Sequence, residues 1–163
     1  DVGEIHVRGR PVFKGYWRKP ELNDVVFTPD GFFHTGDLAR QINDEGYIRI
    51  VGRDKDTIRR MAMTIYPDEV EGVIKTHPKV AQVGVVGVEG EFADERVWAY
   101  VQLHPEMEMT AVEVMDHCRG KLAAFKLPDE VRFMDELPMS SVRRVQRVKL
   151  REQAAMELEE GAG

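Results

Sequence analysis

Four consecutive charged residues, Arg53-Asp54-Lys55-Asp56, follow a strand-like segment and precede a second apolar stretch. Such a group is poorly suited to a protein core, because each buried ion requires a partner to offset its desolvation. Two roles suit it better: a hinge between folded parts of the chain, or a loop that contacts a charged ligand.

Two further segments contain residue types that suit ligand binding. Thr35-Gly36-Asp37 interrupts an extended segment, although such a tripeptide is by itself more often a turn than a nucleotide site. The run from Arg143 to Arg151 holds five basic residues and no acidic one. This run either faces a phosphate group or begins a basic amphipathic helix, with Val142, Val145 and Val148 packed inward.

Composition and charge restrict the classes of function. Of 163 residues, 42% are apolar and 32% charged, which is typical of a globular protein. The net charge of −6 argues against nucleic acid as a partner, and no aromatic residue is interleaved in the basic run for stacking on bases. Cys118 is the only cysteine and the five histidines show no ligand spacing, so we expect no disulfide and no metal site.

The hydropathy pattern predicts no transmembrane segment, since no apolar run approaches the ~20 residues of a membrane span. No signal peptide is visible, and we expect a reducing, cytoplasmic environment. The sequence begins at Asp1 and enters strand-like sequence at once. We therefore interpret it as part of a longer protein.

The region before the charged run is expected to be rich in β-strand. Apolar and polar residues alternate in residues 3–8, 32–42 and 47–51, the last two joined by the turn 43–46 in a hairpin pattern. We expect Phe13, Tyr16 and Trp17 to be packed aromatic residues. This region is too small to form a core alone and has the pattern expected at the end of a preceding domain.

After the charged run the pattern becomes mixed. Helices are predicted from Pro67 to His77, from Thr110 to Leu122 with a capping box to Glu113, and over 150–159. Strands are predicted over 80–88, 96–103 and 131–134. The order predicts an α+β domain, a small sheet covered by two or three helices, and a frayed tail at 159–163.

Several segments resemble, in the right order, the C-terminal motifs of the adenylate-forming (AMP-binding) superfamily. They are HTGDL at 34–38, GYIRIVGRDKD at 46–56, IYPDEVE at 65–71 and FKLPDEVRFMDELP at 125–138. GEIHVRGRPVFKGYW at 3–17 resembles the strand segment that precedes them. This superfamily comprises acyl-CoA synthetases, luciferases and the adenylation domains of peptide synthetases, and the resemblance is closest to acyl-CoA synthetases and fatty-acid-CoA ligases.

The resemblance implies an enzyme with two half-reactions. A carboxylate attacks the α-phosphate of ATP to give an acyl-adenylate and pyrophosphate, and the thiol of coenzyme A then displaces AMP. It also implies two parts of the chain. Residues 1–53 would be the last β segment of a large AMP-binding domain, and residues 54–163 a small mobile lid that rotates between the two steps.

The resemblance also implies roles for individual residues. Asp37 would accept hydrogen bonds from the ribose hydroxyls, and Arg53 would reach the ribose or a phosphate. Thr35 would lie near the α-phosphate. Lys55 falls at the hinge position, where backbone torsions change between two states. Lys126 is a candidate contact for a phosphate group of coenzyme A.

Two places differ from the family pattern. Many relatives have a Gly-Gly pair along the path of the pantetheine arm, where this chain has Met61-Ala62. Relatives end with PxTxxGKIxRxxLR, and alignment of this motif with residues 138–151 places Arg144 at the lysine that reaches the adenylate. It places Arg143 at the glycine. Arginine keeps the positive charge, but its planar fork is not interchangeable with an ammonium group.

The implied ligands of the full-length protein are ATP or AMP with Mg²⁺, coenzyme A and a carboxylic acid. We expect none to bind tightly to this chain alone, because the phosphate loop and the acyl pocket would lie in the missing N-terminal domain. Two alternatives are open. One is a lid that has lost catalysis and serves as a binding or interaction module. The other is the adenylation domain of a peptide synthetase that serves a carrier protein.

Overall fold

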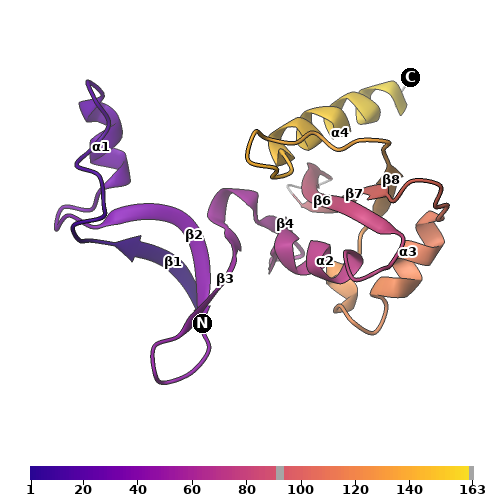
Figure 1. Cartoon of the computed structure of the whole chain (residues 1–163), viewed down its shortest axis with the longest axis horizontal. Coiled ribbons are helices and arrows are strands. Elements are labelled where there is room, and N and C mark those ends of the chain that lie inside the picture. Colours follow the sequence, from indigo (N-terminus) through magenta and orange to yellow (C-terminus); the bar gives the residue numbers. More distant parts are fainter. Residues whose placement is uncertain (91–93, 162–163) are drawn as a thin grey trace. The chain divides into compact units, whose positions relative to one another are not determined.

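The chain separates into two units within the charged run. The structure, a computed structural model, describes residues 1–90 and 94–161. The first unit is Asp1–Lys55 and the second begins at Asp56. Figure 1 shows the strands and helices of each unit along the sequence.

The first unit is built on an antiparallel sheet with the strand order β1-β2-β3. The strands are β1 (Val2–Val7), β2 (Phe33–Gln41) and β3 (Ile48–Arg53). The predicted hairpin is confirmed, since β2 pairs with β3 and Ile42 N donates to the carbonyl oxygen of Tyr47 at 2.8 Å. A short helix, α1 (Pro20–Val26), begins with a proline, which suits the first turn because that position needs no N–H donor.

The aromatic residues of the first unit pack only in part. The ring of Phe13 contacts those of Tyr16, Phe27 and Phe33, with centroids 5.1 to 5.5 Å apart. Trp17 is 83% exposed, so the prediction that it packs is wrong. It lies at the corner of a turn that closes on Tyr16, and residues at turn corners project away from the chain.

The second unit contains a sheet with the order β6-β7-β8, antiparallel between β6 and β7 and parallel between β7 and β8. Its strands are β6 (Val80–Glu89), β7 (Glu95–Leu103) and β8 (Glu130–Phe133). Its helices are α2 (Pro67–Ile74), α3 (Ala111–Cys118) and α4 (Arg147–Gly161). A hairpin of β4 (Ile58–Arg60) and β5 (Met63–Ile65) precedes α2, and the α+β prediction is confirmed.

The sheet of the second unit is covered on both faces, as the apolar runs in β6 and β7 require. Val97, Ala99 and Val101 pack in a core with residues of α2 and α3, whereas Trp98 and Tyr100 pack in a second core with residues of α4. Figure 1 shows α4 on one side of this sheet and α2 and α3 on the other. Among the described residues, no helix is both long enough and apolar enough to span a membrane.

The predicted starts of α2 and α3 are confirmed. Pro67 opens α2, and the side chain of Thr110 forms the capping box with Glu113 at the start of α3. The helix α3 ends at Cys118, so Leu122 is buried beyond the helix rather than on it. The predicted fraying of residues 159–163 lies partly outside the described residues, and α4 is helical as far as Gly161.

The start of α4 differs from the sequence expectation. The helix begins at Arg147, and Val142 and Val148 are 72% and 61% exposed, while Val145 packs against the core beneath α4. The three valines do not share one helical face, because the helix includes only the last of them. The prediction that all three pack inward is therefore wrong for Val142 and Val148.

Candidate nucleotide and hinge site

Thr35, Asp37 and Arg53 lie together on β2 and β3. Asp37 and Arg53 face each other in the strand pairing, and Arg53 Nε donates to Asp37 Oδ1 at 2.8 Å. Arg53 Nη2 donates to the carbonyl oxygen of Thr35 at 3.4 Å. The side chains of Asp37 and Arg53 are 35% and 47% exposed, so the hydroxyl or phosphate groups of a ligand can reach both. The structure thus brings together the three residues predicted to contact the nucleotide.

A bulge in β2 shapes the turn that carries Thr35 and Asp37. Between two of their paired positions, β2 has two more residues than β1, which displaces the turn from the strand pairing. Thr35 Oγ1 donates to the carbonyl oxygen of Ile5 at 2.7 Å and accepts from Asp37 N at 3.0 Å. Gly36 has a φ of 70°, which residues with a Cβ adopt only at a cost. The Thr35 hydroxyl therefore holds Asp37 in its position.

Lys55 lies in one turn of 3₁₀-helix, Asp54–Asp56, and is the last residue of the first unit. Asp56 is held by the second unit. Its Oδ1 accepts from Arg151 Nη2 at 2.8 Å, and its Oδ2 accepts from Arg147 Nη1 at 3.3 Å. The division between the units therefore falls at the peptide bond between Lys55 and Asp56.

Arg147 is the centre of an ion-pair network that the sequence reasoning missed. Its Nε and Nη2 donate to the two carboxylate oxygens of Glu71 at 3.1 and 2.8 Å, and it also pairs with Asp56 and Asp68. Arg147 and Arg151 are four residues apart on α4, and Asp68 and Glu71 are three apart on α2. Each spacing places two like charges on one helix face, which was the available signal. The sequence does not show that these two faces meet.

Burial alters the charge states in this network. It raises the pKa of Glu71, and the positive charge of Arg147 offsets this effect only in part. Burial acts in the same direction on Asp56, but the hydrogen bond from Arg151 and the charge of Arg147 outweigh it, so the pKa of Asp56 is lowered. Burial disfavours the charged guanidinium of Arg147, but Glu71 and Asp68 outweigh it and raise the pKa of this arginine. The network therefore keeps Arg147 charged and ties Asp56 to α4.

Met61 and Ala62 form the two-residue turn between β4 and β5. Their φ values are 50° and 59°, as in the hairpin turns that favour glycine at both central positions. Met61 N donates to Asp94 Oδ1 at 2.7 Å, and the Met61 side chain is 72% exposed. The family's Gly-Gly pair would suit this backbone, and here two residues with side chains adopt it.

Replacing Ala62 with glycine is expected to raise the free energy of unfolding by about 1 kcal/mol, because glycine adopts the left-handed conformation without a Cβ clash. Urea denaturation followed by circular dichroism measures the change. The matched control is Ala123→Gly, since Ala123 is exposed and has a φ of −62°. There the substitution only adds freedom to the unfolded chain and lowers stability. Equal losses in the two variants would contradict the strain at Ala62.

Lys126 is the last residue of one turn of 3₁₀-helix, Ala124–Lys126, that is attached to the β4–β5 hairpin. Arg60 Nη1 donates to the carbonyl oxygens of Phe125 and Leu127, on either side of Lys126, at 3.4 and 3.2 Å. Lys126 Nζ contacts both carboxylate oxygens of Glu69 at 2.7 Å. The structure therefore places Lys126 near the turn that contains Met61 and Ala62, with its charge paired.

Arg144 lies in a tight loop between β8 and α4. Gln146 N donates to the carbonyl oxygen of Pro138 at 2.8 Å, and Ser140 N donates to that of Arg144 at 2.8 Å. Arg143 has a φ of 56°, the conformation that glycine would favour at this position. Arg144 N donates to Ser140 Oγ at 3.1 Å, whereas the Arg144 side chain is exposed and its guanidinium has no partner within the described residues. The backbone of this loop is thus fixed, while the charge at its tip faces solvent.

Comparisons with known proteins find relatives of this chain. Residues 69–143 match the family model of the AMP-binding enzyme C-terminal domain. A medium-chain acyl-CoA ligase of Macaca fascicularis, ACSF2, named as mitochondrial, is 40% identical over 151 residues, which are 93% of this chain and 24% of that protein. A long-chain-fatty-acid–CoA ligase of Yersinia pestis is also 40% identical, over 93% of this chain and 26% of its own length.

Solved structures give the same result. ATP-bound MatB from Rhodopseudomonas palustris matches with a TM-score of 0.86 and 40% identity, over 94% of this chain and 30% of that one. The o-succinylbenzoate CoA synthetase MenE from Bacillus subtilis, in complex with its acyl-adenylate intermediate, matches with a TM-score of 0.85 and 34% identity, over 93% and 30%. The chain spans about a quarter of the length of the curated relatives it matches. It belongs to the adenylate-forming superfamily and carries the AMP-binding enzyme C-terminal domain of acyl-CoA synthetase-like ligases.

Proposed function

We propose that this chain is the lid, together with the last β segment of the large domain, of an AMP-forming acyl-CoA ligase. In this assignment residues 1–53 belong to the large domain and residues 54–163 to the lid. The observation that carries the proposal is the pairing of Asp37 with Arg53 on the sheet that ends directly before the unit boundary at Lys55. The complete activity belongs to the full-length protein.

The proposed reaction has two steps. In the first, a carboxylate oxygen of the acid attacks the α-phosphorus of ATP, and the bond to the pyrophosphate oxygen breaks. In the second, the sulfur of coenzyme A attacks the acyl carbon, and AMP leaves. Asp37 accepts hydrogen bonds from the ribose hydroxyls, and the guanidinium of Arg53 adds donors for the ribose or a phosphate. Arg144 supplies positive charge to the phosphate in the first step.

The other ligands follow from the same proposal. Coenzyme A would pass the turn at Met61 and Ala62, with Lys126 exchanging Glu69 for a phosphate group. We assign no Mg²⁺ ligand to this chain, because the Asp37 carboxylate is engaged by Arg53. The names of the curated relatives favour a medium- or long-chain fatty acid as the substrate.

The single cysteine, Cys118, is a buried free thiol, which fits a reducing compartment, and we propose the cytoplasm as the location. The name of the macaque relative makes the mitochondrion the alternative.

The variant Asp37→Ala of the full-length protein is expected to lower ATP–pyrophosphate exchange by about 100-fold, since it removes two hydrogen bonds of about 1.5 kcal/mol each. Pyrophosphate exchange over a panel of fatty acids measures the effect. Asp44→Ala is the matched control, because Asp44 is an exposed aspartate in the β2–β3 turn. An Asp37 variant that is as active as the control would contradict the ribose contact.

The same assay separates the alternatives. Exchange without formation of acyl-CoA, but with transfer to a carrier protein, would favour a peptide-synthetase adenylation domain. The strained residues Met61, Ala62 and Arg143 are what favours a third candidate, a lid that has lost catalysis and binds a partner. Absence of exchange in the wild type over a broad panel of acids would support that candidate and overturn the ligase assignment.

A further inference from the structure

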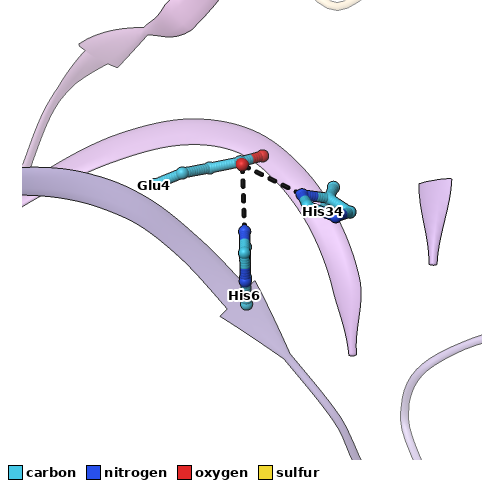
Figure 2. A group of neighbouring side chains, drawn as sticks. All are labelled: Glu4, His6 and His34. Carbon is cyan, nitrogen blue, oxygen red and sulfur yellow. Dashed lines mark hydrogen bonds and ion pairs between the residues drawn. The ribbon is translucent and has the colours of Figure 1, made fainter. Parts of the chain in front are cut away.

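Glu4, His6 and His34 bring three potential metal ligands together in the first unit. His6 Nε2 and His34 Nδ1 each lie 3.0 Å from the same oxygen of Glu4, Oε2. The ligand atoms of the three residues all lie within 4.8 Å of one another. Figure 2 shows both imidazole rings directed at the Glu4 carboxylate.

The strand pairing explains why these residues meet. His6 and His34 are direct partners in the antiparallel pairing of β1 with β2. Glu4 is two residues before His6 on β1, so its side chain lies on the same face of the sheet. The two histidines are far apart in sequence, which is why their spacing gave no metal-binding pattern. Ligands carried on paired strands are held more precisely than ligands on loops.

The carboxylate of Glu4 has the support that metal ligands usually have. Its second oxygen, Oε1, accepts a hydrogen bond from Gly36 N at 2.9 Å, which fixes the orientation of the carboxylate. The side chains of Glu4, His6 and His34 are 28%, 38% and 36% exposed, and an ion can reach them from solvent.

We propose that Glu4, His6 and His34 form a Zn²⁺ site with a fourth position open to water. Two imidazole nitrogens and one carboxylate oxygen are a ligand set that Zn²⁺ accepts in four-coordinate sites. Mg²⁺ and Ca²⁺ prefer oxygen ligands and do not suit it.

The three ligand atoms would move relative to one another to hold the ion. In a tetrahedral site with bonds of about 2.0–2.2 Å, ligand atoms are about 3.4 Å apart. The two contacts of 3.0 Å to Glu4 Oε2 would open by a few tenths of an ångström. The two imidazole nitrogens, which lie within 4.8 Å of each other, would move closer together, and rotation of the two rings provides both changes. The ion would replace the protons that now lie between the imidazoles and the carboxylate.

The proposed metal site shares no residue with the proposed nucleotide contacts, but a hydrogen bond joins the two. Glu4 accepts a hydrogen bond from Gly36 N, and the neighbours of Gly36 in the sequence are Thr35 and Asp37. A bound ion would hold Glu4 in place and, through it, the bulge that positions Asp37. The site is therefore proposed as structural, with no step of the ligase reaction assigned to the ion.

The test is titration of the protein, first dialysed against a chelator, with ZnCl₂ in a calorimeter and with CoCl₂ in a spectrophotometer. The wild type is expected to bind one equivalent and to give the visible absorption of four-coordinate Co²⁺. His6→Gln and His34→Gln are each expected to bind at least about tenfold more weakly, because each loses one ligand. His104→Gln is the control, since His104 is exposed and outside the cluster, and it should bind like the wild type.

A second measurement keeps the test valid if a variant does not fold. In the wild type, Zn²⁺ should shift the ring-proton NMR signals of His6 and His34 and leave that of His104 in place. Lack of a stoichiometric site, or signals of His6 and His34 that do not respond to Zn²⁺, would overturn the proposal and leave a cluster joined by hydrogen bonds alone.

Discussion

Replacing Arg147 with alanine is expected to lower the free energy of unfolding by about 3 kcal/mol, because it leaves the largely inaccessible carboxylate of Glu71 without its partner. The side chains of Arg147, Asp56 and Glu71 are only 17%, 13% and 18% exposed. Asp56 keeps its contact with Arg151, whereas Glu71 loses both hydrogen bonds from the guanidinium. Urea denaturation at neutral pH measures the loss.

The control for Arg147 is Arg119→Ala, which removes an ion pair to Asp116 in which both side chains are more than half exposed. Exposed pairs contribute about 0–1 kcal/mol, so this variant should be close to the wild type. Equal effects of the two substitutions would contradict a buried network.

The deficit of the Arg147 variant should also depend on pH. The folded-state pKa of Glu71 is already raised above 4.5, and loss of Arg147 raises it further. A raised carboxyl pKa contributes stability that is fully present below the unfolded value and lost as the pH rises through the folded one. The deficit is therefore expected to shrink as the pH falls from 7 towards 4.5.

Replacing Leu150 with alanine is expected to lower the free energy of unfolding by about 2–5 kcal/mol, the range for large buried side chains in a packed core. Leu150 is fully buried and packs with Val86, Trp98 and Tyr100 beneath α4. The side chain also approaches Gly84 so closely that a Cβ there would lie 2.5 Å from Leu150 Cδ1. Thermal or urea denaturation measures the change.

Val148→Ala is the matched control on the same helix, because Val148 is 61% exposed. Its effect should stay within about 0.5 kcal/mol, as for most surface substitutions. If the two variants lost equal stability, α4 would not be docked through Leu150.

Local patterns predicted much of the fold, and long-range contacts account for what they missed. The capping box at Thr110 and the proline at position 67 act within one helical turn, so the sequence shows them directly. The Arg147 network needs two helix faces to meet, and the pairing of His6 with His34 needs a strand register. Neither can be derived from spacing along the chain.

The candidate site shows the same difference between local patterns and long-range contacts. Asp37 lies on the first strand of the predicted hairpin, whereas Arg53 lies two residues beyond the predicted second strand, 47–51. A register shift between Leu38 and Ala39 places Arg53 opposite Asp37, and the turn does not predict this shift. The left-handed backbone at Met61 and Arg143 was indicated by the glycines of the family at these positions, although the residues present do not favour it. The pairing of Lys126 with Glu69 joins residues 57 positions apart, and no local rule predicts it.

The ion pair between Arg147 and Asp56 has a consequence for motion at the proposed hinge. Arg147 stands three residues after Arg144, and Asp56 is the first residue of its unit, so a short path joins the proposed hinge at Lys55 to the charged tip of the loop at Arg144. In the proposed assignment this path would act as a lever arm, because a change of the backbone torsions at the hinge would move the tip of the loop with it. A variant that weakened the ion pair between Arg147 and Asp56 without unfolding the protein would keep the charge of Arg144 but position it less precisely. The position of the Arg144 side chain, rather than the affinity for the ligand, would then be impaired.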